Sequence, residues 1–447
     1  MRKVLIANRS EIARRVIRAC HELDLATVAV YSDADAEALH VREADEAVAI
    51  GKPHARASYL NVDKLIGAAR DTGADAIHPG YGFLSESPRF ARACEAAGVT
   101  FVGPSSNAIA AMGDKAAARR LARDAGVPVV PGTEASADVE AALSGADEVG
   151  YPVMVKAAAG GGGRGIRVAR DGDELRQLVP GAAREAEAAF GDASLYVEKL
   201  LEQARHVEIQ VLGEGDANVV HLYERECSLQ RRRQKLVEES PSPALHPSTR
   251  EAMAEAAVRL AEAVGYTSAG TVEFLVDRDE RFYFIEMNTR LQVEHGVTEM
   301  VTGADLVREQ LLVAAGEPLE LSQGEVSPSG SAIEFRINAE DPAQDFQPSP
   351  GRIDTVELPG GPGVRVDTAI YAGYTVAPFY DSLIAKLIVW APTREQALRR
   401  GRRALREFVI EGVATTIPLH LELVEDEGVL TGDVHTGYLE QLLVATA

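Results

Sequence analysis

The chain has 447 residues, of which 46% are hydrophobic and 26% are charged, and its net charge is −22. This length exceeds what one ordinary hydrophobic core organises, so we expect two to four domains. The acidic balance argues against nucleic acid or an anionic membrane surface as a partner, because both bind basic surfaces. No apolar run reaches about 18 residues and the start has no signal-peptide pattern, which predicts a cytoplasmic protein without a membrane span.

The first hundred residues alternate short apolar runs with helical patterns. The apolar runs lie at residues 4–7, 27–31, 47–50, 74–78 and 99–102. Such alternation is typical of a parallel sheet with helices on both faces. Asn8 and Glu11 have the spacing of a capping box at the start of the first helix. The turn there contains no glycine, which excludes a dinucleotide-binding fingerprint.

The remaining chain reads as three further segments. Residues 113–126 have a helical pattern and lead into a boundary with prolines and a glycine. From about residue 203 the apolar and polar residues alternate as in antiparallel sheets, with helical patterns at 248–265, 304–315 and 394–410. We therefore predict four parts: an N-terminal parallel α/β domain at 1–113, a helical connector at 114–130, a small α/β unit at 131–201 and a C-terminal catalytic domain at 202–447.

In the small unit, an apolar strand leads to Lys156, and a glycine run with Arg164 follows. Glycines let backbone N–H groups approach phosphate oxygens, and the lysine adds a positive charge. This pattern favours a phosphate-binding loop over a flexible linker. It is not a Walker loop, because no Gly-Lys-Ser/Thr sequence follows the glycines. The run contains Gly160, Gly161, Gly162, Gly163 and Gly165.

Residues 271–277 and 281–288 read as a β-hairpin. With a loop of two or four residues, Glu273 would lie opposite Phe284 and diagonal to Glu286 on the same face. Two such carboxylates repel by about 4 kcal/mol at 4 Å with an effective dielectric constant near 20, so a cation is expected between them. Carboxylates with the amide of Asn288 suit Mg²⁺.

The chain continues beyond this hairpin with polar residues in strict alternation. Arg290, Gln292 and Glu294 share parity with Glu286, so an extended chain would present them on one face. An arginine matches a small planar oxyanion, and a carboxylate beyond it can accept the remaining proton of that anion. His295 breaks the alternation and is predicted to be structural.

A basic run occupies residues 231–235. Such a run is usually a solvated face or a nucleic-acid patch. Because the whole chain is acidic, we interpret the run instead as a local positive field that attracts anionic substrates.

These segments resemble the ATP-grasp superfamily and, within it, biotin carboxylase. The resemblance covers nearly the whole chain, and EMNTRLQVEH at 286–295 is its most specific motif. The other matching motifs are IANRSEIA (6–13), HPGYGFLSE (78–86), MGDK (112–115), the lysine–glycine loop (156–165), HVEIQ (206–210), ERECSLQRRRQKLVEE (224–239), EFLV (273–276), EFRINAEDP (334–342) and YDSLIAKL (380–387).

The resemblance implies a fold, a reaction and a set of site residues. The fold is ATP-grasp, mixed α/β and α+β, with residues 131–201 as a mobile lid. The reaction converts ATP and bicarbonate into carboxyphosphate and ADP, then carboxylates N1′ of biotin on a carrier protein. ATP would contact Lys115, Lys156, Gly161, Gly162, Gly163, Gly165, Glu198, Leu200, His206, Gln230 and Leu275. Mg²⁺ or Mn²⁺ would bind Glu273, Glu286 and Asn288.

The resemblance also implies how the acceptor and the anion are bound. Bicarbonate would contact Lys235, Arg290, Gln292, Val293 and Glu294, with Glu294 as the base. Arg336 would stabilise the biotin enolate, as an anion in a dry pocket requires. The expected partners are a biotin carboxyl carrier protein and a carboxyltransferase subunit of an acyl-CoA carboxylase of fatty acid biosynthesis, together with a second copy in a homodimer. The chain contains no Ala-Met-Lys-Met biotinylation site, so the carrier is expected on another chain or in a missing segment.

The chain departs from the family pattern at four positions. Arg233 stands where histidine is frequent, Gly296 replaces the usual proline, and Ala158 and Ala159 begin the glycine loop. Two alternatives stay open, namely a different ATP-grasp ligase and a catalytically silent nucleotide-binding regulator. Arg336 favours biotin over other acceptors, and the intact Lys115, Lys156, Glu286, Arg290 and Glu294 favour an enzyme.

Overall fold

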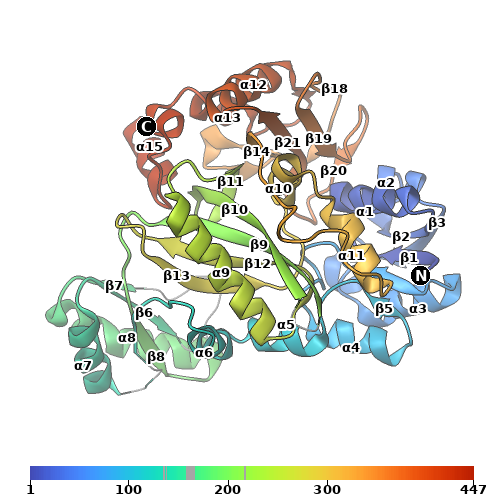
Figure 1. Ribbon diagram of the computed structural model, residues 1–447. Helices are drawn as coiled ribbons and strands as arrows, with labels where there is room; N and C mark the ends of the chain where they lie inside the picture. Colours follow the sequence, from blue (N-terminus) through green and yellow to red (C-terminus); the bar gives the residue numbers. More distant parts are fainter. Residues whose placement is uncertain (134–135, 137, 158–166, 216–217, 447) are drawn as a thin grey trace.

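The structure, a computed structural model, describes every residue except 134–135, 137, 158–166, 216–217 and 447. Its N-terminal part is a parallel sheet, drawn in blue in Figure 1. The strand order is β3-β2-β1-β4-β5, with β1 at Lys3–Ile6, β2 at Ala26–Ser32, β3 at Glu46–Gly51, β4 at Ala76–His78 and β5 at Thr100–Phe101. The predicted parallel sheet is confirmed.

Helices cover both faces of this sheet, because alternate residues of a strand point to opposite sides. Val4 of β1 belongs to the apolar cluster of α1 (Ser10–Glu22), whereas Leu5 packs with α3 (Val62–Thr72) and α4 (Pro88–Ala96). Burial on both faces explains why the strands read as continuous apolar runs.

The start of α1 differs from the prediction. The helix begins at Ser10, and its N-cap residue, Arg9, makes no side-chain cap bond. Asn8 Nδ2 instead donates to two carbonyl oxygens of the loop after β4, both at 2.7 Å. The Glu11 carboxylate accepts from the Tyr81 hydroxyl in the same loop. The predicted capping box is wrong, because both side chains find partners in that loop rather than at the helix end.

A small unit with its own core follows the helical connector. Helix α6 (Lys115–Asp124) confirms the helical pattern predicted at 113–126, and α5 (Ser106–Gly113) precedes that segment. The small unit, at the lower left of Figure 1, is an antiparallel sheet ordered β7-β6-β8 with two helices. Its buried apolar residues form a separate cluster between residues 142 and 197. Its elements are α7 (Val139–Val149), β6 (Val153–Ala157), β7 (Arg167–Ala169), α8 (Gly172–Phe190) and β8 (Leu195–Lys199).

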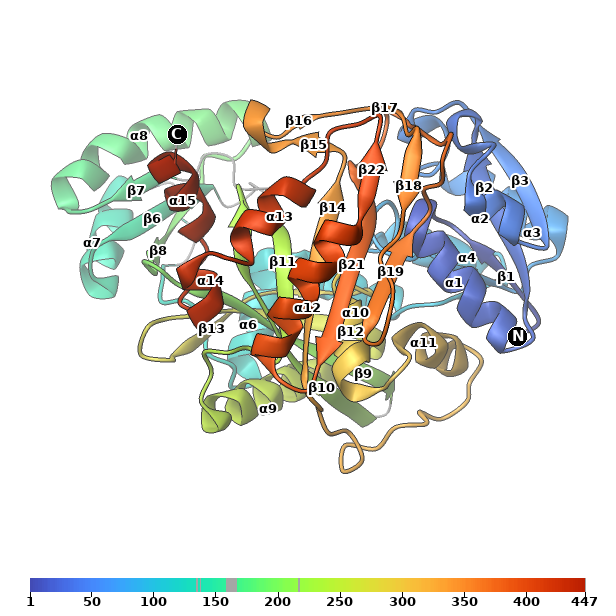
Figure 2. The same ribbon diagram turned by 90° about the horizontal axis from the view of Figure 1, so that it is seen from above.

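A large antiparallel sheet forms the rest of the framework, as the alternating pattern predicted. Its order is β13-β12-β9-β10-β11-β14-β21-β19. Helix α9 (Pro247–Ala263) packs on β9 and β10, and α12 (Arg394–Glu407) packs on β21 and β14 (Figure 2). The strands are β9 (Arg205–Gly215), β10 (Asn218–Arg231), β11 (Gln234–Ser240), β12 (Thr267–Val276), β13 (Phe282–Asn288), β14 (Ser331–Asn338), β19 (Val364–Thr368) and β21 (Leu383–Ala391).

The remaining elements are short and connect these layers. The helices predicted at 248–265, 304–315 and 394–410 are confirmed as α9, α11 and α12. The domain limits stay a prediction. The other elements are α2 (Leu39–Glu43), α10 (His295–Thr302), α11 (Leu306–Ala314), α13 (Ile417–Leu423), α14 (Glu427–Thr431), α15 (Tyr438–Thr446), β15 (Glu340–Asp341), β16 (Gln347–Pro348), β17 (Gly351–Arg352), β18 (Thr355–Glu357), β20 (Thr375–Val376) and β22 (Val409–Glu411).

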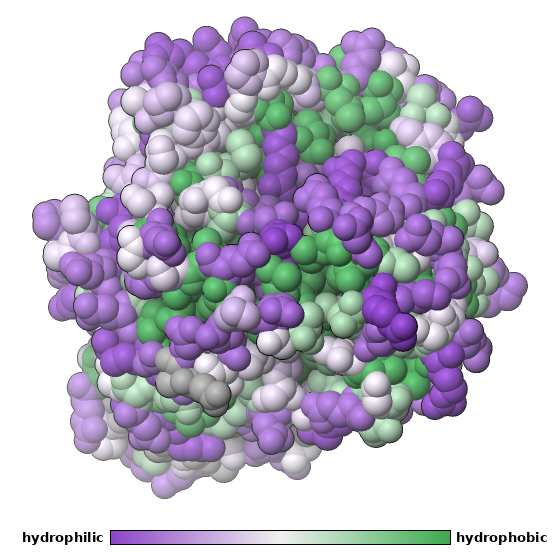
Figure 3. All heavy atoms as spheres, turned by 45° about the vertical axis from the view of Figure 1, so that its right-hand side comes forward, coloured by the Kyte–Doolittle hydropathy of each residue, from purple (hydrophilic) through white to green (hydrophobic). Residues whose placement is uncertain are grey.

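Hydrophilic and hydrophobic residues are mixed on the surface. On the face drawn in Figure 3, hydrophilic residues separate several hydrophobic groups. Among the helices that the structure describes, none combines the length and the apolar character needed to cross a membrane.

Candidate active site

Two carboxylates face each other on the hairpin β12–β13. Glu273 pairs directly with Glu286, and the register then shifts by one residue, which makes Ile285 the extra residue of a β-bulge. The predicted opposition of Glu273 and Phe284 is therefore wrong. Residues 277–281 connect the strands, and such an odd-numbered loop alone would place Glu273 opposite Ile285. The bulge brings the two carboxylates onto one face, as bulges near active sites often do.

The chain leaves the extended conformation after Asn288, where β13 ends. Glu294 is the N-cap residue of α10, with φ −79° and ψ 11°. The prediction of one extended ribbon through Glu294 is wrong, because a turn must precede the helix. The turn nevertheless directs Arg290 and Gln292 to the same cavity as Glu286.

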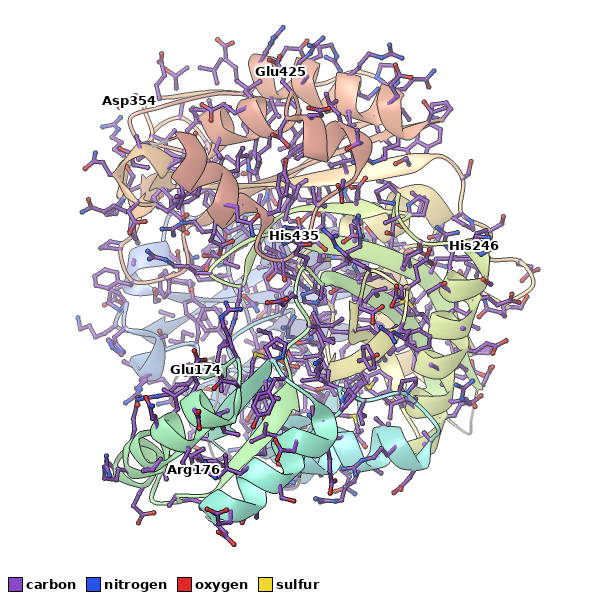
Figure 4. All side chains as sticks on the ribbon, turned by 90° about the vertical axis from the view of Figure 1, so that its left-hand side faces the viewer. Glu174, Arg176, His246, Asp354, Glu425 and His435 are labelled. Carbon is purple, nitrogen blue, oxygen red and sulfur yellow. The ribbon has the colours of Figure 1, made fainter. Side chains whose placement is uncertain are left out.

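A cavity of about 1510 Å³ lies between the N-terminal sheet, the small unit and the large sheet. Thr436 and Gly437 reach it from the C-terminal segment, where Figure 4 labels His435. Most predicted site residues line this cavity: Lys115, Lys156, Leu200, His206, Gln230, Lys235, Glu273, Leu275, Glu286, Asn288, Arg290, Gln292, Val293 and Arg336.

Some predicted site residues do not line the cavity. Glu198 and Glu294 are buried in its wall, with 4% and 0% of their surface exposed. Each forms ion pairs with cations at the cavity wall: Glu198 with Lys156, and Glu294 with Lys235 and Arg336. The loop predicted to contact phosphate lies outside the described residues, as do the departures at its start: Ala158, Ala159, Gly160, Gly161, Gly162, Gly163, Arg164 and Gly165.

Lys235 connects three carboxylates at the cavity wall. Its Nζ lies 2.6 Å from Glu208, 3.0 Å from Glu273 and 2.6 Å from Glu294. Burial alone would lower the pKa of Lys235, but the three carboxylates raise it well above its ordinary value. The lysine is therefore a permanent cation at this point of the cavity.

Glu294 is ionised and already accepts one hydrogen bond on each oxygen. Lys235 Nζ donates to Oε1 at 2.6 Å, and Arg336 Nη2 donates to Oε2 at 2.9 Å. Burial favours the neutral acid, but Lys235 and Arg336 bring the pKa of Glu294 well below its ordinary value. Each carboxylate oxygen accepts up to two hydrogen bonds, so Glu294 retains capacity for a proton donor.

Arg290 is fixed by a residue that the sequence reasoning missed. Its Nε donates to Glu86 at 2.9 Å, and the Thr289 backbone N–H donates to the other oxygen of Glu86 at 3.1 Å. Arg290 Nη2 also donates to Asn288 Oδ1 at 3.0 Å. Glu86 ends the HPGYGFLSE motif, but that position reveals nothing of its partner 204 residues away in sequence. Glu86 orients the guanidinium toward the cavity.

The facing carboxylates differ in their charge balance. Burial favours protonation of Glu273, but Lys235 and His206 lower its pKa far below the ordinary value. Burial and the neighbouring Glu273 raise the pKa of Glu286. The cation recorded nearest to Glu286 is Lys115, whose Nζ is 4.0 Å away. Negative charge on Glu286 is thus the less balanced of the two.

These residues fit a hard divalent cation. Glu273, Glu286 and Asn288 offer carboxylate and amide oxygens, which Mg²⁺ prefers, and a cation would relieve the repulsion that raises the pKa of Glu286. A second possible group consists of His206, Glu208 and Glu273, whose ligand atoms lie within 4.8 Å of one another. Both oxygens of Glu208 already bond to cations, Oε1 to Arg225 and Oε2 to Lys235, so we do not assign a metal there.

Lys156 lies in a cluster of cations. Glu198 forms ion pairs with both Lys156 and Arg119. Burial, Arg119 and Lys115 lower the pKa of Lys156 to about 8. Arg119 is a second residue that the sequence reasoning missed. Such a concentration of positive charge suits a polyanion such as a nucleotide phosphate.

Two further residues have structural partners. Gln230 Nε2 lies 2.8 Å from His206 Nδ1, and His206 Nε2 lies 3.0 Å from Glu273, so Gln230 orients the imidazole. His295 is buried, with Nδ1 2.8 Å from the Gln292 carbonyl oxygen, and burial lowers its pKa to about 3. A neutral, buried His295 agrees with its predicted structural role.

The basic run divides between structure and cavity. Arg231 and Arg232 form ion pairs with Asp345. Arg232, Arg233 and Lys235 line the cavity, whereas Arg231 does not. Only part of the run therefore contributes the predicted positive field.

The chain has the fold of an ATP-grasp ligase. This fold combines a parallel N-terminal sheet, a small unit of one sheet and two helices, and an antiparallel sheet whose edge hairpin carries facing carboxylates. Family models agree over most of the chain: "Biotin carboxylase, N-terminal domain" matches residues 1–109, "Carbamoyl-phosphate synthase L chain, ATP binding domain" matches 114–322, and "Biotin carboxylase C-terminal domain" matches 334–441. The chain belongs to the biotin carboxylase family.

Full-length relatives support this assignment. Biotin carboxylase 1 of Bacillus subtilis is 57% identical over 98% of each chain. A pyruvate carboxylase subunit of Methanothermobacter thermautotrophicus is 52% identical over 98% of this chain and 89% of its own length. The biotin carboxylase domain dimer of Hydrogenobacter thermophilus 2-oxoglutarate carboxylase, solved with MgADP, ADP and bicarbonate, has a TM-score of 0.91 at 51% identity, over 98% of this chain and 97% of that one.

Proposed function

We propose that this chain uses ATP to activate bicarbonate as carboxyphosphate and then carboxylates N1′ of biotin on a carrier protein. The observation that supports the proposal most is that three groups meet at one cavity. They are cations that can bind phosphate, a pair of carboxylates that can bind a metal ion, and a cluster of arginine, lysine and carboxylate side chains. The reaction needs these three groups together, because the anion must attack the terminal phosphate of the nucleotide.

The nucleotide would lie against the small unit and the edge of the large sheet. Lys115 and Lys156 offer positive charge to its phosphates, and Leu275 offers an apolar surface to its base. Glu273, Glu286 and Asn288 would bind Mg²⁺, which neutralises phosphate charge when bound. The unbalanced charge of Glu286 supports this assignment.

Bicarbonate would lie between Arg290, Gln292, Lys235 and the Val293 backbone. Arg290, oriented by Glu86, can donate to a planar oxyanion. Its Nη1 already bonds to the Leu291 carbonyl oxygen and to Gln292, and its Nη2 bonds to Asn288, so the anion would replace one of these contacts to gain a second N–H donor. Glu294 would accept the bicarbonate proton while the anion's oxygen bonds to the phosphorus and ADP leaves. The low pKa of Glu294 makes it a weak base. It is nevertheless ionised at neutral pH, and a position next to the bound bicarbonate would offset part of this weakness.

The acceptor would be the ureido ring of biotin. The phosphate released from carboxyphosphate would accept the N1′ proton, and the carboxyl group would bond to N1′. Arg336 offers N–H donors to the negative charge that develops on the ureido oxygen. Because relatives include proteins named for pyruvate and 2-oxoglutarate carboxylases, the acyl-CoA carboxylase assignment rests on the sequence resemblance. The carrier protein, the carboxyltransferase partner, the homodimer and the cytoplasmic location belong to this proposal.

Bicarbonate-dependent ATP hydrolysis, measured with and without free biotin, tests the proposal. We expect hydrolysis to require bicarbonate, biotin to accelerate it, and carboxybiotin to appear by mass spectrometry. A silent nucleotide-binding regulator would hydrolyse no ATP, and another ATP-grasp ligase would ignore biotin; either result would refute the proposal.

A further inference from the structure

Arg336 is bound on one edge by two buried carboxylates. Its Nε donates to Glu238 Oε1 at 2.6 Å, and its Nη2 donates to Glu294 Oε2 at 2.9 Å. Among the described residues, no partner is recorded for Nη1, and the side chain lines the cavity. The guanidinium thus has one bound edge and one edge available to a ligand.

Glu238 is a buried carboxylate whose main charged partner is Arg336. It lies on β11, between β10 and β14, and none of its surface is exposed. Its second oxygen is buried without a hydrogen-bond partner in the described part of the chain. The residue directly across on β14 is Glu334, another fully buried carboxylate. Glu238 is therefore a buried carboxylate whose ion pair is with Arg336, and such a contact can hold the guanidinium in one orientation.

We infer that Glu238 is a positioning residue that fixes the Arg336 guanidinium for carboxyl transfer to biotin. This inference rests on the proposed function, because Arg336 acts only where biotin is the acceptor. When Glu294 accepts the bicarbonate proton, it loses its charge and its hydrogen bond to Arg336 weakens. Glu238 is then the carboxylate that keeps Arg336 in place, with Nη1 and Nη2 turned to the ureido oxygen.

The charge of Glu238 depends on pH near neutrality. Burial raises its pKa to about 7, against the opposing effect of Arg336. The other groups that face it are Glu294, Lys235, Glu334 and Cys227. Because the ionised form is lost as pH falls through about 7, the orientation of Arg336 weakens on the acidic side. Biotin-dependent turnover should therefore fall on that side more steeply than turnover without biotin.

The test compares Glu238→Gln with a matched control. Glu239 is the next residue of β11, is also buried with 6% of its surface exposed, and its carboxylate forms an ion pair with Arg394 at 2.6 Å. In Glu238→Gln we expect carboxybiotin formation to fall about 10- to 100-fold, while bicarbonate-dependent ATP hydrolysis without biotin stays within about twofold. Glu239→Gln should leave the ratio of the two rates at the wild-type value.

Two further measurements make the inference falsifiable. Arg336→Ala and the double variant Arg336→Ala with Glu238→Gln should lose the same fraction of carboxybiotin formation, because Glu238 acts through Arg336. If Glu238→Gln does not fold, Glu238→Asp replaces it, since it keeps the charge but shortens the side chain. Equal losses in both rates, or an additive double variant, would overturn the inference and leave the proposed function intact. Absence of bicarbonate-dependent hydrolysis in the wild type would instead overturn the proposed function.

Discussion

Glu294 is the residue on which the buried charge network converges. It accepts hydrogen bonds from Lys235 and Arg336, and these cations keep it ionised. Lys235 also forms ion pairs with Glu208 and Glu273. A proton taken up by Glu294 therefore changes the charge balance of the whole cavity wall at once.

Replacing Glu294 by glutamine should remove the base and leave the nucleotide site intact. We expect bicarbonate-dependent turnover to fall by about 10² to 10⁴-fold, the usual contribution of a positioned base. The dissociation constant for ATP, measured by calorimetry, should change little, since Lys115 and Lys156 remain. Near-normal turnover of Glu294→Gln would show that another group accepts the proton.

The ammonium group of Lys156 predicts how ATP affinity depends on pH. Burial and neighbouring cations lower its pKa to about 8. The positive charge is present below that pH and is lost above it, so ATP affinity should weaken by up to about tenfold per pH unit above 8. Titration calorimetry between pH 7 and 9.5 measures this. Lys156→Arg should remove the dependence, whereas Lys199→Arg, which alters a lysine bonded to the Gly150 and Tyr151 carbonyl oxygens, should retain it. A flat profile in the wild type would contradict the account.

Helices and strands could be predicted from the sequence where neighbouring residues alone determine them. Alternating apolar runs predicted the parallel sheet, and the two strands of the β12–β13 hairpin followed from their own residues. The bulge at Ile285 could not be predicted, because no residue type marks it and the large sheet selects the register. Asn8 and Glu11 matched a helix cap, yet tertiary partners in the loop after β4 replaced that role.

The candidate site shows the same limit. Residue types indicated which side chains carry the chemistry, and most of them do line one cavity. The residues that orient them could not be predicted from the sequence. Glu86 contacts Arg290 and Arg119 contacts Glu198, and the two members of each pair lie far apart in the chain. The extended ribbon was also wrong, since the start of α10 imposes a turn at Glu294.

The packing of α10 on β21 is close at one position where the chain departs from the family pattern. Gly296, where proline is usual, lies in the first turn of α10, and a Cβ there would overlap the Cδ1 methyl of Ile388. We predict that Gly296→Ala lowers the free energy of unfolding by about 1 to 3 kcal/mol through overpacking. Adding Ile388→Val removes the overlapping methyl and should recover part of that loss, although Ile388→Val alone costs about 0.5 to 1.5 kcal/mol. Urea denaturation of the three variants measures both effects, and strictly additive losses would contradict this packing account.

The whole molecule combines an acidic exterior with a locally basic cavity. The net charge is −22, yet Lys115, Lys156, Lys235, Arg290 and Arg336 all line the same space. This contrast resolves how an acidic protein could attract two anionic substrates, because the field near a site depends on local charges more than on the total. The small unit with its own core forms one side of the cavity, through Met154, Lys156, Ala157 and Tyr196.

In the proposed reaction, bicarbonate and ATP react directly with each other in this cavity. If a bicarbonate oxygen attacks the terminal phosphorus, that oxygen remains bonded to phosphorus when carboxyphosphate breaks down. Turnover with ¹⁸O-labelled bicarbonate, followed by mass spectrometry of the released phosphate, tests this directly. A direct attack should give phosphate that carries one ¹⁸O atom from each bicarbonate consumed. Phosphate without label would show that no bond forms between a bicarbonate oxygen and phosphorus.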